Sequence, residues 1–401
     1  MQFESKLADI PTTIFTVVSR RAREIGALDI GQGFPDYPID SLLSEHVTAA
    51  MREGRNQYAP MTGVAELREA IAQKVELTYQ KAVDAETEIT VTCGGTEALH
   101  SAILALVRTG DEVVVFDPAY DSYEPVVNLA GGRCVRIPLS PPLFRPDWER
   151  FAAALSPRTR LVIINNPHNP VGTVWSRADL DDLARLIRDR PVAVLSDEVY
   201  EHVVFDGLRH ESVLSHAELA QRSLAVFSFG KTLHATGWRL GYCIAPAGLT
   251  AEVRKVHQFN TFSLATPIQH GIARYLEAKP AAWRDLGAFF QQKRDLLCDA
   301  LEGSGFVIRR AQGTYFQILD FSAISDLADV DFVERMIADA RIAALPVSPF
   351  YSARTSARPR LSLMRVCFAK REQTLQQAAD RLRDFAARLA DDPAAQELAA
   401  T

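Results

Sequence analysis

Four polar segments stand directly after short apolar runs, and each holds side chains that could do chemistry. They are residues 93–97, 165–172, 196–200 and 228–241. The first, Cys-Gly-Gly-Thr-Glu, puts backbone N–H groups and a hydroxyl ahead of a helical pattern, which suits an anion but is equally explained as a helix cap. Purely structural explanations also exist for the next two segments. The second could be a Pro-rich turn, and in the third Asp197 could be a helix N-cap. Taken singly, these segments leave structure and function open.

Short apolar runs and helical patterns alternate between about residues 90 and 245, which is typical of βαβ units. Most runs are apolar on both faces, as strands covered by helices must be. The predicted strands are 89–92, 112–116, 134–137, 161–164, 192–195, 224–227 and 240–244. We therefore expect an α/β fold with a seven-stranded, mostly parallel sheet. Ligands bind outside the carboxyl ends of such strands, so the four polar segments should lie together.

The pattern changes after this sheet and predicts a second, smaller domain. Helical periodicity dominates at 250–258, 269–278 and 280–303, and short strands then mix with helices, as in an α+β unit. We expect residues 41–285 to form the large domain and residues 286–401 the small one. Residues 1–40 should form an N-terminal arm that belongs to the small domain.

Composition argues against several classes of function. The 401 residues carry 44 Lys and Arg against 50 Asp and Glu, and the net charge of −6 offers no basic surface for nucleic acid. No apolar run approaches the roughly 20 residues of a membrane span, and no signal-peptide pattern is present. We therefore expect a cytoplasmic protein that binds neither nucleic acid nor membranes. The five cysteines and nine histidines lack the spacing of a disulfide framework or a metal site.

The segment from Ser228 to Gly241 decides between the two interpretations. It reads S-x-x-K followed by G-W-R-x-G, and it comes after loops that read N-P-x-N-P-x-G and D-x-x-Y. In this order and spacing the chain resembles class I/II pyridoxal-phosphate-dependent aminotransferases of fold type I. Its details resemble most the bacterial methionine aminotransferases and, next to them, the kynurenine and glutamine-phenylpyruvate transaminases. The resemblance extends over nearly the whole chain.

This resemblance implies pyridoxal 5'-phosphate as the cofactor and assigns the groups around its ring. Lys231 would hold it through its amine and later shuttle a proton, a task that desolvation and nearby Arg239 favour by stabilising the neutral amine. Asp197 would face the ring nitrogen and keep it protonated. Tyr200 and Asn169 would bind the phenolate oxygen.

The resemblance also implies a phosphate site and a ring that stacks on the cofactor. Tyr120 would lie against the pyridine, although it could instead be a core tyrosine. Arg239 and a helix N-terminus would supply positive charge for the phosphate. The other residues expected around the cofactor are Gly95, Thr96, Glu97, Ser228 and Tyr58, the last contributed by the neighbouring subunit of a homodimer with shared active sites.

Substrate binding is the task that the resemblance implies for Arg365, whose guanidinium can present two parallel donors to an α-carboxylate. A surface ion pair is the alternative. The Gly33 backbone and Asn169 would assist. An apolar lining for the substrate side chain is expected from Phe15, Phe34, Tyr37, Tyr120, Phe262 and Tyr351, any of which could instead be ordinary core.

The sequence thus predicts an enzyme that moves the amino group of an L-amino acid to a 2-oxo acid. Donors with methionine, aromatic or other uncharged side chains are expected. One alternative is a cysteine-conjugate β-lyase, because the same lysine and aspartate can expel a leaving group from the β-carbon. A more remote alternative is a non-catalytic sensor, which would carry a winged-helix domain that this chain does not show.

Overall fold

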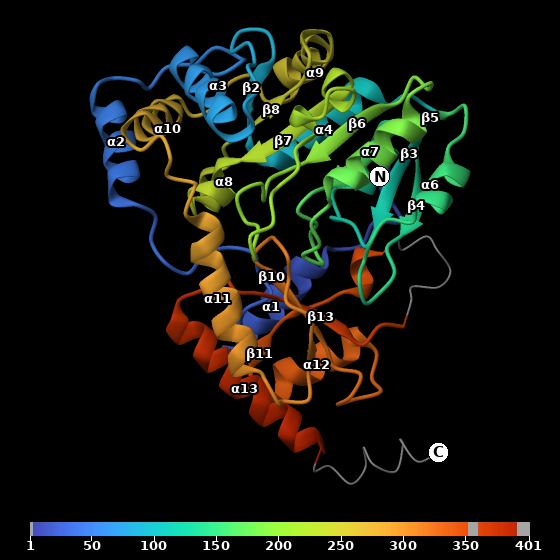
Figure 1. Ribbon diagram of the computed structural model, residues 1–401. Helices are drawn as coiled ribbons and strands as arrows, with labels where there is room; N and C mark the ends of the chain where they lie inside the picture. Colours follow the sequence, from blue (N-terminus) through green and yellow to red (C-terminus); the bar gives the residue numbers. More distant parts are fainter. Residues whose placement is uncertain (1–2, 352–359, 391–401) are drawn as a thin grey trace.

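The large sheet lies in the upper part of the molecule in Figure 1, a computed structural model that describes residues 3–351 and 360–390. Within these residues seven strands form one sheet in the order β2-β8-β7-β6-β5-β3-β4. β8 is antiparallel to both of its neighbours and the other pairs are parallel. The predicted fold class is confirmed. The strands are β2 (Ile89–Thr92), β3 (Glu112–Asp117), β4 (Arg133–Pro138), β5 (Thr159–Asn165), β6 (Ala193–Asp197), β7 (Ser223–Ser228) and β8 (Gly241–Ile244).

Helices cover both faces of this sheet, which explains why its strands are apolar throughout. Val113 and Val115 of β3 point into one core, with residues of α4 and α5, whereas Val114 and Phe116 point into the other. Successive strand residues face opposite sides, so both sets must be apolar. The helices of this part are α2 (Ser41–Arg52), α3 (Ala65–Tyr79), α4 (Gly94–Leu106), α5 (Tyr123–Leu129), α6 (Trp148–Ala154), α7 (Arg177–Ile187), α8 (Phe229–Thr232), α9 (Ala247–Asn260) and α10 (Thr266–Ala278).

The lower part of Figure 1 holds a smaller antiparallel sheet of order β12-β13-β10-β9. Its strands are β9 (Val307–Ile308), β10 (Phe316–Asp320), β12 (Leu345–Pro346) and β13 (Leu363–Cys367), and its helices are α11 (Leu286–Ala300), α12 (Asp329–Ala340) and α13 (Glu372–Ala390). The N-terminal segment joins this part: after α1 (Ile14–Ile25), β1 (Leu28–Asp29) pairs in parallel with β11 (Ile342–Ala343). Short 3₁₀ helices are η1 (Val213–Ser215), η2 (Leu219–Gln221), η3 (Thr236–Trp238) and η4 (Ser348–Phe350).

One predicted helix is shorter than its pattern suggested. Periodicity predicted a helix over 280–303, but α11 starts at Leu286 and residues 280–285 form turns. Trp283 is nevertheless buried within these turns. The spacing of apolar residues over 280–285 therefore reflects packing against the core and not a helix. Along the described ranges, no helix combines the length and apolar character needed to cross a membrane.

The sheet register gathers the four polar segments at one edge. Thr92 and Ser228, the last residues of β2 and β7, both pair with Gly241. Asn165 at the end of β5 pairs with Asp197 at the end of β6. The residues that follow these strands therefore meet above the same end of the sheet.

Candidate active site

A cavity of about 150 Å³ lies at this end of the sheet. Nearly all of its lining comes from segments that follow strands, together with the first turn of α4. The lining residues are Gly95, Thr96, Leu99, Tyr120, Asn165, Asn169, Asp197, Val199, Tyr200, Ser228, Lys231 and Arg239.

Asp197 is a buried carboxylate in the wall of this cavity. The Tyr123 hydroxyl donates a 2.7 Å hydrogen bond to its Oδ2, and the backbone N–H of Val199 lies 3.4 Å from Oδ1. The Asp197 carbonyl accepts from the Asn165 side chain at 2.8 Å and from the Asn166 N–H at 3.0 Å. Burial raises the pKa of Asp197 to about 6, against the lowering effect of the Tyr123 bond. Such a carboxylate favours a cationic partner.

Lys231 is the amine of the site and lies on the short helix α8. Its Nζ is 3.5 Å from the Gly33 carbonyl oxygen and lies over the rings of Tyr200 and Tyr315. Burial lowers the pKa of Lys231 to about 8, and the charge of Arg239 acts in the same direction. This is the direction expected from the sequence, and it leaves a substantial neutral fraction near neutral pH.

The first turn of α4 and Arg239 form a cradle suited to an anion. A Cβ on Gly94, whose φ is +69°, would lie 2.9 Å from Arg239 Nη2, and one on Gly95 would lie 2.8 Å from Val199. The two glycines therefore let the helix N-terminus approach the guanidinium closely. Thr96 Oγ1 lies 3.5 Å from the Tyr120 hydroxyl in the same wall.

Arg365 lies at the centre of β13 and is fully buried. Its Nη1 donates to Asn169 Oδ1 at 2.6 Å and its Nη2 to the Gly31 carbonyl at 3.0 Å, whereas Nε has no hydrogen-bond partner among the described residues. The guanidinium lies 3.7 Å from the centre of the Phe316 ring. Burial lowers the pKa of Arg365 to about 10. A surface ion pair, the alternative considered for this residue, is excluded because its side chain is buried and bonded to neutral oxygens.

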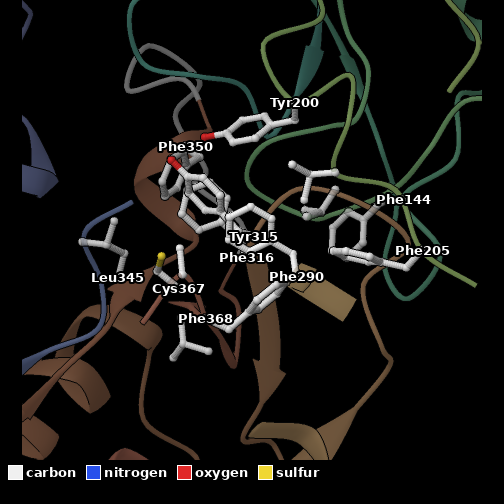
Figure 2. Packing of buried hydrophobic residues seen from close by; sticks show 14 of the residues in the cluster. Phe144, Tyr200, Phe205, Phe290, Tyr315, Phe316, Leu345, Phe350, Cys367 and Phe368 are labelled. Atoms are coloured by element: carbon white, nitrogen blue, oxygen red, sulfur yellow. The ribbon is translucent and has the colours of Figure 1, made fainter. Parts of the chain in front are cut away.

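Aromatic rings join the cavity to the small domain. Figure 2 shows Tyr200 beside Tyr315, Phe316 and Phe350, at the junction of the two parts of the chain. Tyr200 contacts Tyr315 edge-on at 5.0 Å between ring centres and Phe316 at 5.8 Å. Phe15 from α1 contacts Phe350 at 5.6 Å and flanks Arg365 at 5.3 Å. The Arg365 end of the site is therefore largely apolar.

Several residues expected in the site do not line this cavity within one subunit. Gly33, Arg365 and Phe15 lie beside it. The others outside the lining are Phe34, Tyr37, Tyr58, Glu97, Phe262 and Tyr351. The Glu97 carboxylate accepts from Ser101 and the Cys93 N–H and bonds His257 at 2.9 Å, so it faces the helix packing instead. Tyr37 packs against His234 and Phe289, and its buried hydroxyl has no hydrogen-bond partner in the part of the chain that the structure describes.

Tyr58 lies at the surface. It is 83% exposed and contacts Phe262 at 5.3 Å between ring centres. Phe259, three positions before Phe262 in the chain, is 91% exposed.

Sequence reasoning missed three residues that shape the site. Tyr123 bonds Asp197, the Asn165 Oδ1 accepts from the Asn169 N–H at 2.7 Å, and the Tyr315 hydroxyl donates to the Gly33 carbonyl at 2.7 Å. The available signals were the second Tyr three positions after Tyr120, the doubled Asn in the Pro-rich loop, and the Gly-Thr-Tyr-Phe segment at 313–316, which is part of the family resemblance. No group of three or more His, Cys, Asp or Glu able to hold a metal ion occurs in the portion that the structure describes.

Comparison with known proteins identifies the family. The family described as aminotransferase class I and II matches residues 25–382. The chain belongs to this family. It is 51% identical over 382 residues to the methionine aminotransferase of Escherichia coli K12, covering 95% of this chain and 98% of that protein. Human kynurenine–oxoglutarate transaminase 1 is 32% identical, with 91% and 93% covered.

A solved structure agrees with these relatives. The crystal structure of YbdL from Escherichia coli, a protein with a methionine aminotransferase function, superposes with a TM-score of 0.92 at 50% identity, covering 96% of this chain and all of that one. The chain is thus an amino acid aminotransferase of fold type I that acts on small molecules, and the predicted enzyme class is confirmed.

Proposed function

We propose that this aminotransferase binds pyridoxal 5'-phosphate in the cavity and moves the amino group of an uncharged L-amino acid to a 2-oxo acid. One observation carries the proposal: three buried or half-buried ionisable groups converge, each with its pKa moved by burial. They are the Lys231 amine, the Asp197 carboxylate and the Arg365 guanidinium. Perturbed groups gathered in one cleft are typical of active sites.

The donor set fits this cofactor. Bound pyridoxal phosphate supplies an aldehyde carbon that accepts amino groups and a ring that accepts electrons. The buried Asp197 carboxylate would hold the ring nitrogen in its protonated form. Tyr200 and Asn169 would bind the phenolate oxygen, and Tyr120 would stack on the ring. The cradle formed by Gly95, Thr96, Ser228 and Arg239 would bind the phosphate.

Lys231 Nζ would act as the base of the reaction. A pKa of about 8 leaves its neutral form available to take the proton from the substrate α-carbon and return it to the product. Arg365 would hold the substrate α-carboxylate with its Nε and Nη groups, assisted by Asn169 and the Gly33 backbone. Both contacts orient the α-carbon toward Lys231.

Donor preference follows from the rings near Arg365. Phe15, Phe316 and Phe350 surround its guanidinium. A carboxylate side chain placed there would be desolvated and would compete with the substrate α-carboxylate for the Arg365 guanidinium. Burying a methionine or phenylalanine side chain instead should gain about 1.5 to 3 kcal/mol, or roughly tenfold to a hundredfold in kcat/KM over alanine. The similarity to the Escherichia coli methionine aminotransferase supports the same preference.

The test compares kcat/KM for methionine, phenylalanine, alanine and aspartate with one common 2-oxo acid. Aspartate equal to methionine would refute the apolar preference. Pyruvate released from a cysteine conjugate without any 2-oxo acid would indicate a β-lyase instead. Borohydride should fix the cofactor on Lys231, and labelling of another lysine would refute that assignment.

A second subunit would complete the site. The exposed rings of Tyr58 and Phe262 contact each other, and Phe259 near the end of α9 is also exposed. Exposed apolar rings of this kind are typical of protein interfaces. We expect a homodimer in which Tyr58 reaches the partner's phosphate. Mixed Tyr58→Phe and Lys231→Ala subunits should then place both defects in one site and leave the other intact. An active monomer in sedimentation measurements would refute the shared site.

A further inference from the structure

The segment after β6 faces the cavity with some residues and the opposite side with others. Asp197 and Tyr200 line the cavity, whereas Glu198 and Glu201 are buried behind them. Residues 198–203 form turns, closed by hydrogen bonds from the Glu201 N–H to the Glu198 carbonyl and from the Val203 N–H to the Tyr200 carbonyl. The backbone of the turn therefore connects the buried Glu198 and Glu201 carboxylates to Asp197 and Tyr200, which line the cavity.

Glu201 is held by several partners from other elements. Lys74 Nζ of α3 lies 2.7 Å from its Oε1, and the two side chains are only 1% and 2% exposed. The Tyr79 hydroxyl donates to Oε2 at 2.5 Å, and the Tyr242 hydroxyl of β8 lies 3.4 Å from Oε1. His202 Nε2 lies 3.3 Å from the same oxygen. The carboxylate is thus fixed from α3, from β8 and from its own turn.

Stability alone does not account for such a pair. Removing two opposite charges from water costs several kcal/mol per ion, and buried pairs replaced by apolar residues are often as stable. The ring centres of Phe227, Tyr242 and Trp283 lie 5.3 to 5.8 Å from the Lys74 ammonium. These rings keep the Lys74 side chain oriented toward Glu201. What a costly buried ion pair can contribute instead is a fixed geometry for the segments that it joins.

Tyr200 is the cavity residue next to this anchor in the chain, and its ring also packs on Tyr315 and Phe316. Asp197 is already held by the β6 ladder and by Tyr123. Tyr200 lies beyond the strand, inside the turn, and its neighbour Glu201 carries the ion pair with Lys74. Glu198 secures the other end through Ser196 at 2.7 Å and the Val213 N–H at 3.0 Å.

We infer that the buried Lys74–Glu201 pair is a positioning device for Tyr200, and that it sets how well the Tyr200 hydroxyl donates to the cofactor phenolate oxygen. The inference rests on the proposed function, which places that oxygen beside Tyr200. A turn that relaxes by a fraction of an ångström weakens the hydrogen bond without removing any group that touches the cofactor.

The test replaces the pair with neutral residues of similar size, Lys74→Met with Glu201→Gln. The pH midpoint of the visible absorbance change of the cofactor-loaded enzyme should rise by about one unit, because one donor to a charged oxygen is weakened. The dissociation constant for pyridoxal phosphate, measured on cofactor-free protein, should rise about tenfold. Stability in urea should change little. Tyr79→Phe, a milder change that removes one bond to Glu201, should move the midpoint in the same direction by less.

A double-mutant cycle separates positioning from general damage. Tyr200→Phe alone should raise the midpoint, and adding the pair substitution to it should raise it no further. Arg188→Met with Glu218→Gln removes an exposed ion pair of equal length and should leave the midpoint unchanged.

A pair substitution whose effect is the same with and without the Tyr200 hydroxyl would overturn the inference. So would an unchanged midpoint in the pair and Tyr79→Phe variants while Tyr200→Phe moves it. Failure of the unaltered protein to bind pyridoxal phosphate would overturn the proposed function, and this inference with it.

Discussion

Substituting Tyr123→Phe should make the stability of the cofactor-free protein strongly pH-dependent above pH 5. The substitution removes the 2.7 Å hydrogen bond to the buried Asp197 carboxylate and leaves the ring in place. The pKa of Asp197 in the folded protein is already raised from 3.8 to about 6 by burial. A hydrogen bond to a charged group contributes about 1.5 to 3 kcal/mol, so its loss should raise this pKa by roughly one to two units more.

The sign follows from proton linkage. A carboxylate whose pKa is higher in the folded than in the unfolded state binds its proton more tightly when folded, so stability falls as pH rises between the two values. For the unaltered protein the fall runs from about pH 4 to 6 and amounts to about 3 kcal/mol. In Tyr123→Phe it should continue toward neutral pH. The gap in unfolding free energy between the two proteins should therefore widen by about 1 to 2 kcal/mol between pH 5 and pH 8.

Urea unfolding of both cofactor-free proteins at four pH values, followed by circular dichroism, measures this gap. Taking the difference removes the contribution of all other titrating groups. Tyr275→Phe is a matched control, because the Tyr275 hydroxyl also donates to a carboxylate, Asp40, whose pKa is lowered by its bond to Lys279. Its gap should stay constant over this range. A constant gap for Tyr123→Phe would refute the reasoning about Asp197.

Three further predictions concern other parts of the chain. The pKa of Lys231 is lowered to about 8, so the rate at which cofactor-free protein captures pyridoxal phosphate should rise with pH and level off above pH 8. Stopped-flow absorbance measures this rate, and a rise that continues to pH 10 would contradict the prediction. Arg365→Lys should lower kcat/KM for methionine about a hundredfold, since an ammonium cannot offer two parallel donors, and a change below threefold in steady-state assays would count against the carboxylate role. Gly63→Ala should cost about 2 to 4 kcal/mol in urea unfolding, because φ is +96° and the new Cβ would lie 2.3 Å from Val91 Cγ2. Gly26→Ala, at φ +64° with no atom within 4 Å, should cost only about 1 kcal/mol, and equal losses would show that the contact with Val91 is unimportant.

The sheet and the approach of its polar loops could be predicted because their signals are local. Apolar runs on both faces mark covered strands, and chain order places their carboxyl ends together. Asn165, Asp197 and Ser228 could thus be expected at one edge of the sheet from the amino-acid sequence alone. Family resemblance added roles that spacing alone does not contain.

Contacts between distant segments could not be predicted in the same way. Tyr123 and Asp197 are 74 positions apart, and their hydrogen bond depends on how α5 packs against α4 and β4. Glu97 follows Thr96 directly, yet helical rotation turns it away from the cavity toward His257. Tyr37 was expected to line the site and packs instead on Phe289. Periodicity gives the type of an element but not which of its faces meets which neighbour.

The bond between Arg365 and the Gly31 carbonyl joins residues 334 positions apart and has a consequence for synthesis. The groups around Asp197, Lys231 and Arg239 all precede the end of β8, so they leave the ribosome well before Arg365. At about 5 to 20 residues per second, roughly ten seconds separate the two events. During that interval the residues of the anion cradle and Gly31 have been synthesised, whereas Arg365, the partner of Gly31, has not. The two parts of the candidate site are therefore supplied at different times, and the part that contains Arg365 requires segments from both ends of the chain.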